Sequence, residues 1–178
     1  MADNVLWSPI DKNNFLTEFI TSLNEKNLFK GNDYELLHKW SISNKKKFWS
    51  EIWNFTSIIG EYKDPVVENE NDFINSIFFK NSKLNFSQNL IQIKDDSDAL
   101  VFYSEKGFNR RITWKQLDEQ VSKIAHYFYS QKIQKGDRVG AVLPNIPEAV
   151  IAFLGAAKIG AIWSSCSADF GPQAVIDR

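Results

Sequence analysis

The sequence predicts an α/β fold in which a helical, aromatic-rich cap precedes the first part of a doubly wound parallel sheet. Composition changes sharply near residue 90: 14 of the 16 Asn lie in residues 1–90, whereas ten of the eleven Ala follow them. Apolar residues recur at helical spacing before the change, and strand-like runs alternate with a helical pattern after it. We therefore divide the chain into a cap region with a linker, residues 1–90, and an α/β region, residues 91–178.

The cap region is expected to form three helices that pack through aromatic side chains. The apolar face of the first helix comprises Phe15, Leu16, Phe19, Ile20 and Leu23. Asp33 can cap a second helix, and Asn44 stands before a third. The second and third helices carry the large rings Trp40, Phe48, Trp49, Trp53 and Phe55. These rings could form an aromatic ligand box, but no polar group is interleaved to orient a ligand, so packing of the helices onto the neighbouring domain is the simpler interpretation.

Two charged segments of the cap region are interpreted as solvent-exposed. The acid-rich residues 61–72 are expected to form an exposed linker. Three consecutive lysines, Lys45, Lys46 and Lys47, are expected to form a solvated first turn of the third helix and not an anion site.

The α/β region is expected to begin with a hairpin and a helix. Residues 99–104 and 110–114 have strand character, and Gly107 marks the turn between them. Thr113 and Gln116 have the spacing of a capping box at the start of a helix. The apolar face of that helix comprises Leu117, Val121, Ile124, Ala125 and Phe128. His126 lies beside this face and is interpreted as a structural or surface histidine.

The rest of the region alternates between strand and helix. Residues 139–143 and 161–165 are expected to be parallel strands, joined by a helix over residues 148–159 that Pro147 precedes and Gly160 stops. Pro172 then opens another helix. Because ligands of such sheets bind at the carboxyl ends of the strands, residues 143–145 and 165–171 are the expected ligand-binding loops.

Composition excludes several classes of function. The chain has 21 Lys and Arg against 22 Asp and Glu, so it has no bulk positive field for nucleic acid or an anionic membrane. One Cys and two His exclude an intrachain disulfide and disfavour a Cys- or His-rich metal site, which fits a cytoplasmic protein. The N-terminus lacks the pattern of a secretory signal. The most apolar stretch, residues 149–163, contains Lys158 and is too short to span a membrane.

No catalytic or metal-binding residue is predicted from the motifs. Gly155 and Gly160 have the spacing of a phosphate-binding loop, but Ala161 stands where the loop requires Lys, and the glycines fall within and at the end of a helix. Cys166 has no partner at a recognisable spacing to activate it and is interpreted as a small buried residue. Asp169 is either a polar ligand contact or a cap for the helix that follows.

Three segments resemble the N-terminal part of AMP-forming acyl-CoA synthetases, which belong to the adenylate-forming superfamily. They are residues 136–171, the Thr-Trp-x-x-Leu segment at 113–117 and the Leu-Asn-x-x-x-Asn-Leu segment at 84–90. Residues 160–171 are most similar to the acetoacetyl-CoA synthetase branch, and residues 6–9, 37–42 and 48–49 also match that branch. The resemblance covers the chain from Trp7 to Arg178.

The resemblance implies a ligase that joins acetoacetate to CoA with ATP and Mg²⁺ and releases AMP and pyrophosphate. It also implies that the chain is a truncated N-terminal fragment, inactive alone, because the phosphate loop and the catalytic Lys of such enzymes would lie beyond Arg178. A complementary C-terminal polypeptide is then a possible partner.

One loop can be compared with the CoA site of the family. Ser167, Ala168 and Asp169 align with positions that approach CoA in acetyl-CoA synthetases, although all three differ in residue type. These three residues are the candidate CoA-side loop. The resemblance implies the location of this loop but not its contacts with CoA. Two other functions stay open: a fragment of an acetyl- or propionyl-CoA synthetase, and a non-enzymatic binding or interaction module.

Overall fold

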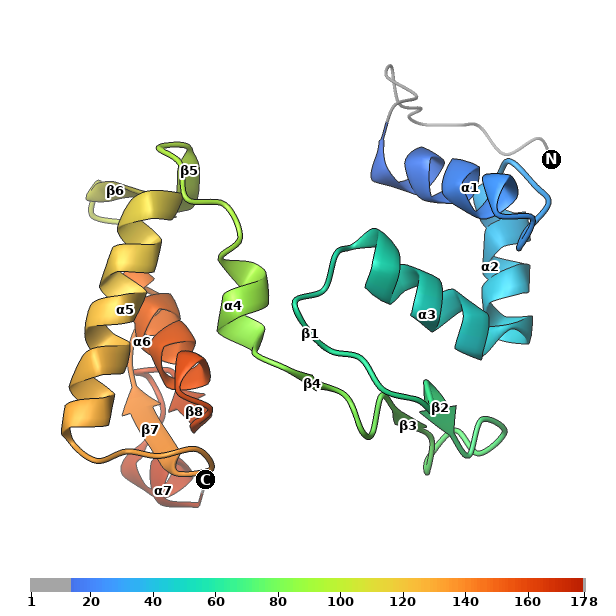
Figure 1. Cartoon of the computed structure of the whole chain (residues 1–178). Helices are drawn as coiled ribbons and strands as arrows, with labels where there is room; N and C mark the ends of the chain where they lie inside the picture. The colour runs from blue at the N-terminus through green and yellow to red at the C-terminus, as the bar shows by residue number, and fades with distance from the viewer. Residues whose placement is uncertain (1–13, 178) are drawn as a thin grey trace, which may run out of the picture. The chain divides into compact units, whose positions relative to one another are not determined.

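The computed structural model describes residues 14–177, which form two compact units (Figure 1). The first unit ends at Lys83 and the second begins at Leu84. The matching segment at residues 6–9 lies outside the described residues. Within residues 14–177, no helix is both long and apolar enough to cross a bilayer.

The first unit begins with the three expected helices: α1 (Phe15–Glu25), α2 (Tyr34–Ser43) and α3 (Lys45–Phe55). Asp33 caps α2 by accepting a hydrogen bond from the Leu36 backbone N–H at 2.9 Å. Asn44 makes no such cap, and its amide donates to the Trp40 carbonyl of the preceding helix at 3.1 Å. The core of the helices is formed by Phe19, Ile20, Leu23, Phe29 and Leu37.

Aromatic rings pack against one another throughout this unit. Trp40 lies beside Phe48, with ring centroids 6.3 Å apart, and Trp53 lies 5.1 Å from Phe79. Trp49 contacts Phe78 at 5.6 Å. Trp40, Trp49 and Trp53 therefore pack within the unit. Packing onto a neighbouring domain stays a prediction.

The acid-rich segment is not an exposed linker along its whole length, so that expectation is wrong. Three two-residue strands lie in this unit, β1 (Gly60–Glu61), β2 (Val67–Glu68) and β3 (Ile77–Phe78), and a fourth, β4 (Lys83–Leu84), spans the boundary with the second unit. β2 pairs antiparallel with β3, and Val66 and Val67 are only 4% and 3% exposed. The two valines bury apolar surface that the acidic residues around them do not reveal.

The second unit contains the expected hairpin and helices. Its elements are α4 (Phe86–Leu90), β5 (Asp98–Tyr103), β6 (Asn109–Thr113), α5 (Trp114–Ser130), β7 (Arg138–Val142), α6 (Pro147–Lys158), β8 (Ile162–Cys166) and α7 (Pro172–Ile176). β5 and β6 are antiparallel, and the turn between them places Gly107 at a φ of 75°. Both hydrogen bonds of the predicted capping box at Thr113 and Gln116 are present.

β7 and β8 form the expected parallel pair, with Arg138 opposite Ile162 and Val142 opposite Cys166. α6 connects them, and Gly160, at a φ of 77°, ends it. The core that joins α5, α6 and the hairpin consists of Ile91, Ile112, Leu117, Val121, Ile151 and Leu154.

α4 falls in the second unit, although the composition placed its residues in the cap region. Asn85 accepts a hydrogen bond from the Gln88 backbone N–H at 3.0 Å and so caps α4. Its amide also donates to the carbonyls of Ala157 and Lys158, at 2.9 and 3.1 Å, where α6 ends. Phe86 adds a ring contact with Phe153, with centroids 5.5 Å apart. One side chain thus joins the start of α4 to the end of α6.

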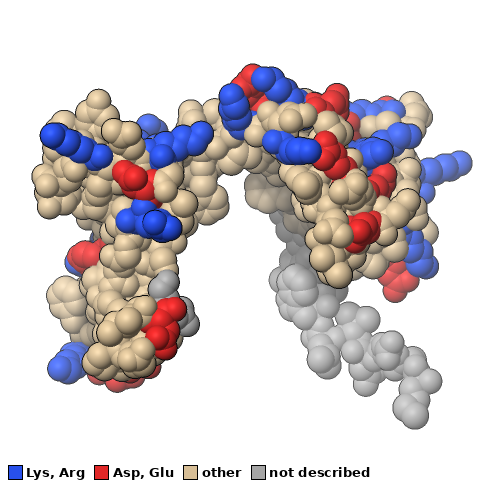
Figure 2. Space-filling model, turned by 90° about the horizontal axis from the view of Figure 1, so that it is seen from below, with Lys and Arg blue, Asp and Glu red and all other residues tan. Residues whose placement is uncertain are grey.

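Positive and negative side chains are intermixed on the face that Figure 2 shows, and no extended area of one sign is visible there. This distribution agrees with the near-zero formal charge of −1. It gives that face no broad field that would attract a polyanion.

A glycine at the crossing of α5 and α6 provides a test of this packing. A Cβ at Gly155 would overlap the Ile124 Cγ2 methyl and approach the Ala125 backbone N to 3.3 Å. Helix propensity alone predicts that Gly155→Ala raises the unfolding free energy by about 1 kcal/mol. We expect the opposite, a loss of about 1–3 kcal/mol in urea unfolding, because the helices must separate.

Ile124→Ala serves as the matched background for this test, since it removes the overlapping methyl group. In that background, Gly155→Ala should lower the unfolding free energy by at least about 1 kcal/mol less than it does in the unaltered chain. Equal effects in the two backgrounds would show that the helices do not cross closely at this position.

Candidate functional site

The candidate site is the edge of the second unit at which β7 and β8 both end. Because the two strands are parallel and in register, the loops that follow them leave from the same edge. The Leu143 backbone N–H donates to the Cys166 carbonyl at 3.1 Å, which extends the pairing one residue past β7. The structure therefore brings together the two predicted loops, residues 143–145 and 165–171, except that Ser165 and Cys166 still belong to β8 and the second loop begins at residue 167.

The loop after β8 is short and exposed. The Phe170 backbone N–H donates to the Ser167 carbonyl at 3.2 Å and closes a turn over residues 167–170. Ser167, Ala168 and Asp169 are all exposed on this turn. A hydrogen bond from the Ser167 side chain lowers the pKa of the Asp169 carboxyl below its ordinary value of 3.8, so this carboxyl is ionised at neutral pH.

The start of α6 is fixed beside the other loop by an ion pair. Arg110 of β6 lies 2.7 Å from Glu148, in the first turn of α6. The hydrogen bond from Arg110 lowers the pKa of the Glu148 carboxyl, which therefore stays charged near the helix N-terminus. Asn145 lies between this helix and the hairpin, in the wall of a 180 Å³ cavity that also includes Phe102.

The two faces of the parallel pair have different surroundings. On one face, Trp163 contacts Phe153 of α6, with ring centroids 6.4 Å apart. The other face lines a 420 Å³ cavity together with Val175 of α7. Val142 and Ile162 on this second face remain 49% and 55% exposed.

The site can support binding, but its described residues carry no evident bond-making chemistry. Cys166 is free and buried at the end of β8, as its sequence position suggested. His126 is exposed on α5, and among residues 14–177 no group of three or more His, Cys, Asp or Glu could hold a metal ion. Gly155 lies inside α6, so the two-glycine pattern is not a phosphate-binding loop.

A second polar cluster was missed by the sequence interpretation. Lys94, Asp118 and Lys158 form ion pairs beside α4, although Lys158 stood out only as a charge within an apolar stretch. Asp118 lies 24 positions after Lys94 and 40 positions before Lys158, so no local spacing could have revealed the cluster.

Most of the second unit matches a family model, and nearly the whole chain is similar to CoA synthetases. Residues 90–177 match the model of a family described as AMP-binding enzyme. The chain is 37% identical over 99% of its length to an acetoacetyl-coenzyme A synthetase of Rhizobium meliloti (strain 1021), of which it covers 28%. A malonamoyl-CoA synthetase of Penicillium aethiopicum is 30% identical over 99% of this chain, which covers 26% of that protein.

The structural comparison agrees. Acetoacetyl-CoA synthetase from Streptomyces lividans superposes with a TM-score of 0.84 at 29% identity, over 93% of this chain and 26% of that one. The expected fold class, the N-terminal part of the adenylate-forming enzyme fold, is therefore confirmed. The chain spans about a quarter of the length of the curated relatives it matches.

Proposed function

Because the chain is homologous over nearly its whole length to acetoacetyl-CoA synthetases, we propose that it is the N-terminal part of an acetoacetate–CoA ligase. The proposal depends chiefly on one observation, the agreement of the structure with such a synthetase over 93% of the chain. In the proposed reaction, the acetoacetate carboxylate attacks the α-phosphorus of ATP and displaces pyrophosphate. The CoA thiol then attacks the acyl carbon and displaces AMP, which leaves acetoacetyl-CoA.

The names of the relatives favour acids with a β-carbonyl group. Acetoacetate and malonamate share this group and differ only in the methyl or amino group attached to it. Acetate and propionate lack it, so they are the weaker candidates among the alternatives.

We propose residues 1–90 as the cap region and residues 91–178 as the first part of the AMP-dependent synthetase domain. We also propose that the protein is cytoplasmic.

We assign the exposed turn at Ser167, Ala168 and Asp169 to the CoA side of the proposed site. The Asp169 carboxylate is charged, so the phosphates of CoA are unfavourable neighbours. The uncharged pantetheine arm, which carries amide groups, suits the Ser167 hydroxyl and the turn backbone better. No group of three or more His, Cys, Asp or Glu among the described residues could hold a metal ion, so no residue of the turn is assigned to Mg²⁺.

We expect the chain alone to have no adenylating activity. Pyrophosphate departure requires positioned donors and a metal ion. Among residues 14–177, no group of three or more His, Cys, Asp or Glu could hold a metal ion. The measurement is carboxylate-dependent ATP–pyrophosphate exchange with acetoacetate, malonamate, acetate and propionate. Exchange above a no-protein control with any of these acids would contradict this expectation.

Exchange should appear when the chain is co-expressed with the remaining three quarters of the Rhizobium relative. Acetoacetate should then be the preferred acid. A preference for acetate or propionate would contradict the β-carbonyl assignment while leaving the ligase assignment intact.

The CoA-side assignment has its own test in this reconstituted protein. Ala168→Trp should leave ATP–pyrophosphate exchange unchanged and lower thioester formation about tenfold or more, because the ring would occupy the space proposed for the pantetheine arm. Ala174→Trp is the matched control, because Ala174 is also exposed but lies in α7, outside the turn. Equal thioester rates in the two variants would remove this turn from the CoA site.

We also propose that the parallel pair associates with further polypeptide, a complementary C-terminal chain in particular. Within residues 14–177, β7 and β8 pair only with each other, and Val142 and Ile162 expose apolar surface. The chain alone should therefore self-associate with increasing concentration in sedimentation experiments, and the co-expressed remainder should suppress this association.

A charge on the uncovered face should weaken self-association. Ile162→Lys is the test variant, and Ile176→Lys, which replaces a 76% exposed residue of α7, is the control. A compact monomer at all concentrations, with cooperative thermal unfolding, would contradict the proposal and favour the free-standing binding module.

A further inference from the structure

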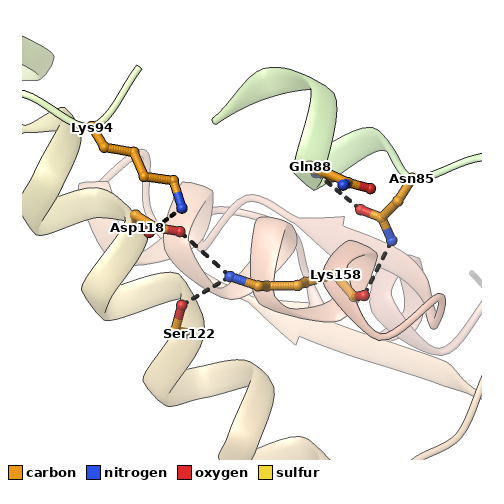
Figure 3. Close-up of polar contacts among 6 residues, drawn as sticks. All are labelled: Asn85, Gln88, Lys94, Asp118, Ser122 and Lys158. Atoms are coloured by element: carbon orange, nitrogen blue, oxygen red, sulfur yellow. Dashed lines mark hydrogen bonds and ion pairs between the residues drawn. The ribbon is translucent and has the colours of Figure 1, made fainter. Parts of the chain in front are cut away.

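A polar cavity of 330 Å³ lies between α4, α5 and the end of α6. Its wall is formed by Asn85, Ser87, Gln88, Ile91, Lys94, Asp118 and Lys158. This volume lies at the lower end of the range typical of small-molecule sites, so it suits a small ligand. Figure 3 shows six side chains of this region and the contacts among them.

Two lysines share one carboxylate in this cavity. Lys94 Nζ lies 3.0 Å from Asp118 Oδ2, and Lys158 Nζ lies 3.4 Å from Asp118 Oδ1 (Figure 3). Lys158 Nζ also donates to the Ser122 hydroxyl at 2.8 Å. Burial opposes ionisation of Asp118, but hydrogen bonds and charges from the two lysines hold the pKa of its carboxyl below its ordinary value. The three side chains therefore carry a net charge of about +1 at neutral pH.

Each ammonium group keeps further capacity to donate. An ammonium group has three N–H bonds, and among residues 14–177 Lys94 contacts one acceptor, the Asp118 carboxylate. The Lys94 and Lys158 side chains are 61% and 39% exposed, so a dissolved anion can reach both. Two ammonium groups on the same wall exclude a divalent cation as the ligand.

A buried hydroxyl in the same wall provides an independent observation. Ser87 is 1% exposed, and its Oγ has no hydrogen-bond partner among the described residues. Leaving such a group unsatisfied costs about 1–3 kcal/mol, so a buried orphan hydroxyl needs an explanation. Ser87 lines the cavity, so a ligand oxygen there can accept its hydrogen bond once the side chain turns toward the cavity.

The cavity is separate from the site at the strand ends. Asn85 in its wall binds the last carbonyls of α6, at Ala157 and Lys158, and β8 begins only after this point. Ser167, Ala168 and Asp169 follow the opposite, carboxyl end of β8. A ligand here would therefore not occupy the proposed CoA-side loop.

We propose that this cavity binds a small oxyanion between Lys94 and Lys158, with the Ser87 hydroxyl as a third donor. Phosphate and carboxylate groups share the required chemistry, which is several acceptor oxygens and negative charge. Asp118 holds the two lysines in place on the cavity wall. The site is independent of the proposed ligase activity and requires no other polypeptide.

Inorganic phosphate and acetate are the probes, each titrated into the full chain at an ionic strength kept constant with sodium chloride. Binding is measured from backbone amide chemical shifts of residues 85–94 and 118–122, and from the thermal unfolding midpoint. We expect saturable shifts with one or both probes, and the tighter one identifies the oxyanion. Shifts that follow ionic strength alone would overturn the proposal.

Two variants separate binding from a purely structural role. Lys94→Gln should weaken binding of the tighter probe about tenfold, because a charged hydrogen bond is lost. Ser87→Ala should weaken it about fivefold, yet leave the unfolding midpoint without ligand unchanged or higher, since the hydroxyl loses no protein partner. Lys106→Gln, in the exposed turn between β5 and β6, is the control and should bind like the unaltered chain.

The outcomes distinguish the two roles clearly. Equal dissociation constants, within twofold, for the unaltered chain, Lys94→Gln and Ser87→Ala would overturn the proposal. If Lys94→Gln fails to fold, the comparison between Ser87→Ala and the unaltered chain still decides the result.

Discussion

The close crossing of α5 and α6 is the constraint on which the rest of the second unit depends. At Gly155 the two helices lie so near each other that Ile124 occupies the space a Cβ would need. Leu117, Val121 and Leu154 are almost fully buried around this crossing. α5 is joined to the hairpin at its start, and α6 is joined to a strand at each end, so their packing fixes the strands. A side chain at Gly155 would therefore disturb β7 and β8 as well as the helices.

This constraint reaches the candidate site through the chain connections. α6 begins directly after the loop that follows β7, and the Arg110–Glu148 ion pair fixes its first turn beside the hairpin. The loop after β8 depends in turn on the register of the parallel pair. Both loops are thus positioned by buried apolar contacts, although their own side chains are exposed. Such an arrangement allows binding residues to differ between relatives without loss of the fold.

The elements that the sequence predicted well are those with strong local signals. Helical spacing, the capping box at Thr113 and the turn glycines Gly107 and Gly160 are properties of neighbouring residues, and the structure confirms each. The linker expectation failed because β2 and β3 bury Val66 and Val67 through pairing that local composition does not encode. The Lys94–Asp118–Lys158 cluster was missed for a similar reason. Its members meet only because the helices pack, and charge alone gives no indication of this contact.

Asn85 belongs to the Leu-Asn-x-x-x-Asn-Leu segment, one of the segments on which the family resemblance depends. Its oxygen caps α4 and its amide binds the last carbonyls of α6, so all the polar atoms of its side chain are engaged in joining two helix ends. No other residue type of this size presents an acceptor and two donors at that distance from the backbone. This part of the matching segment therefore has a structural role, since it joins the start of α4 to the end of α6. A chain that shares it with a synthetase can be expected to inherit the shape of the protein, whether or not it inherits the reaction.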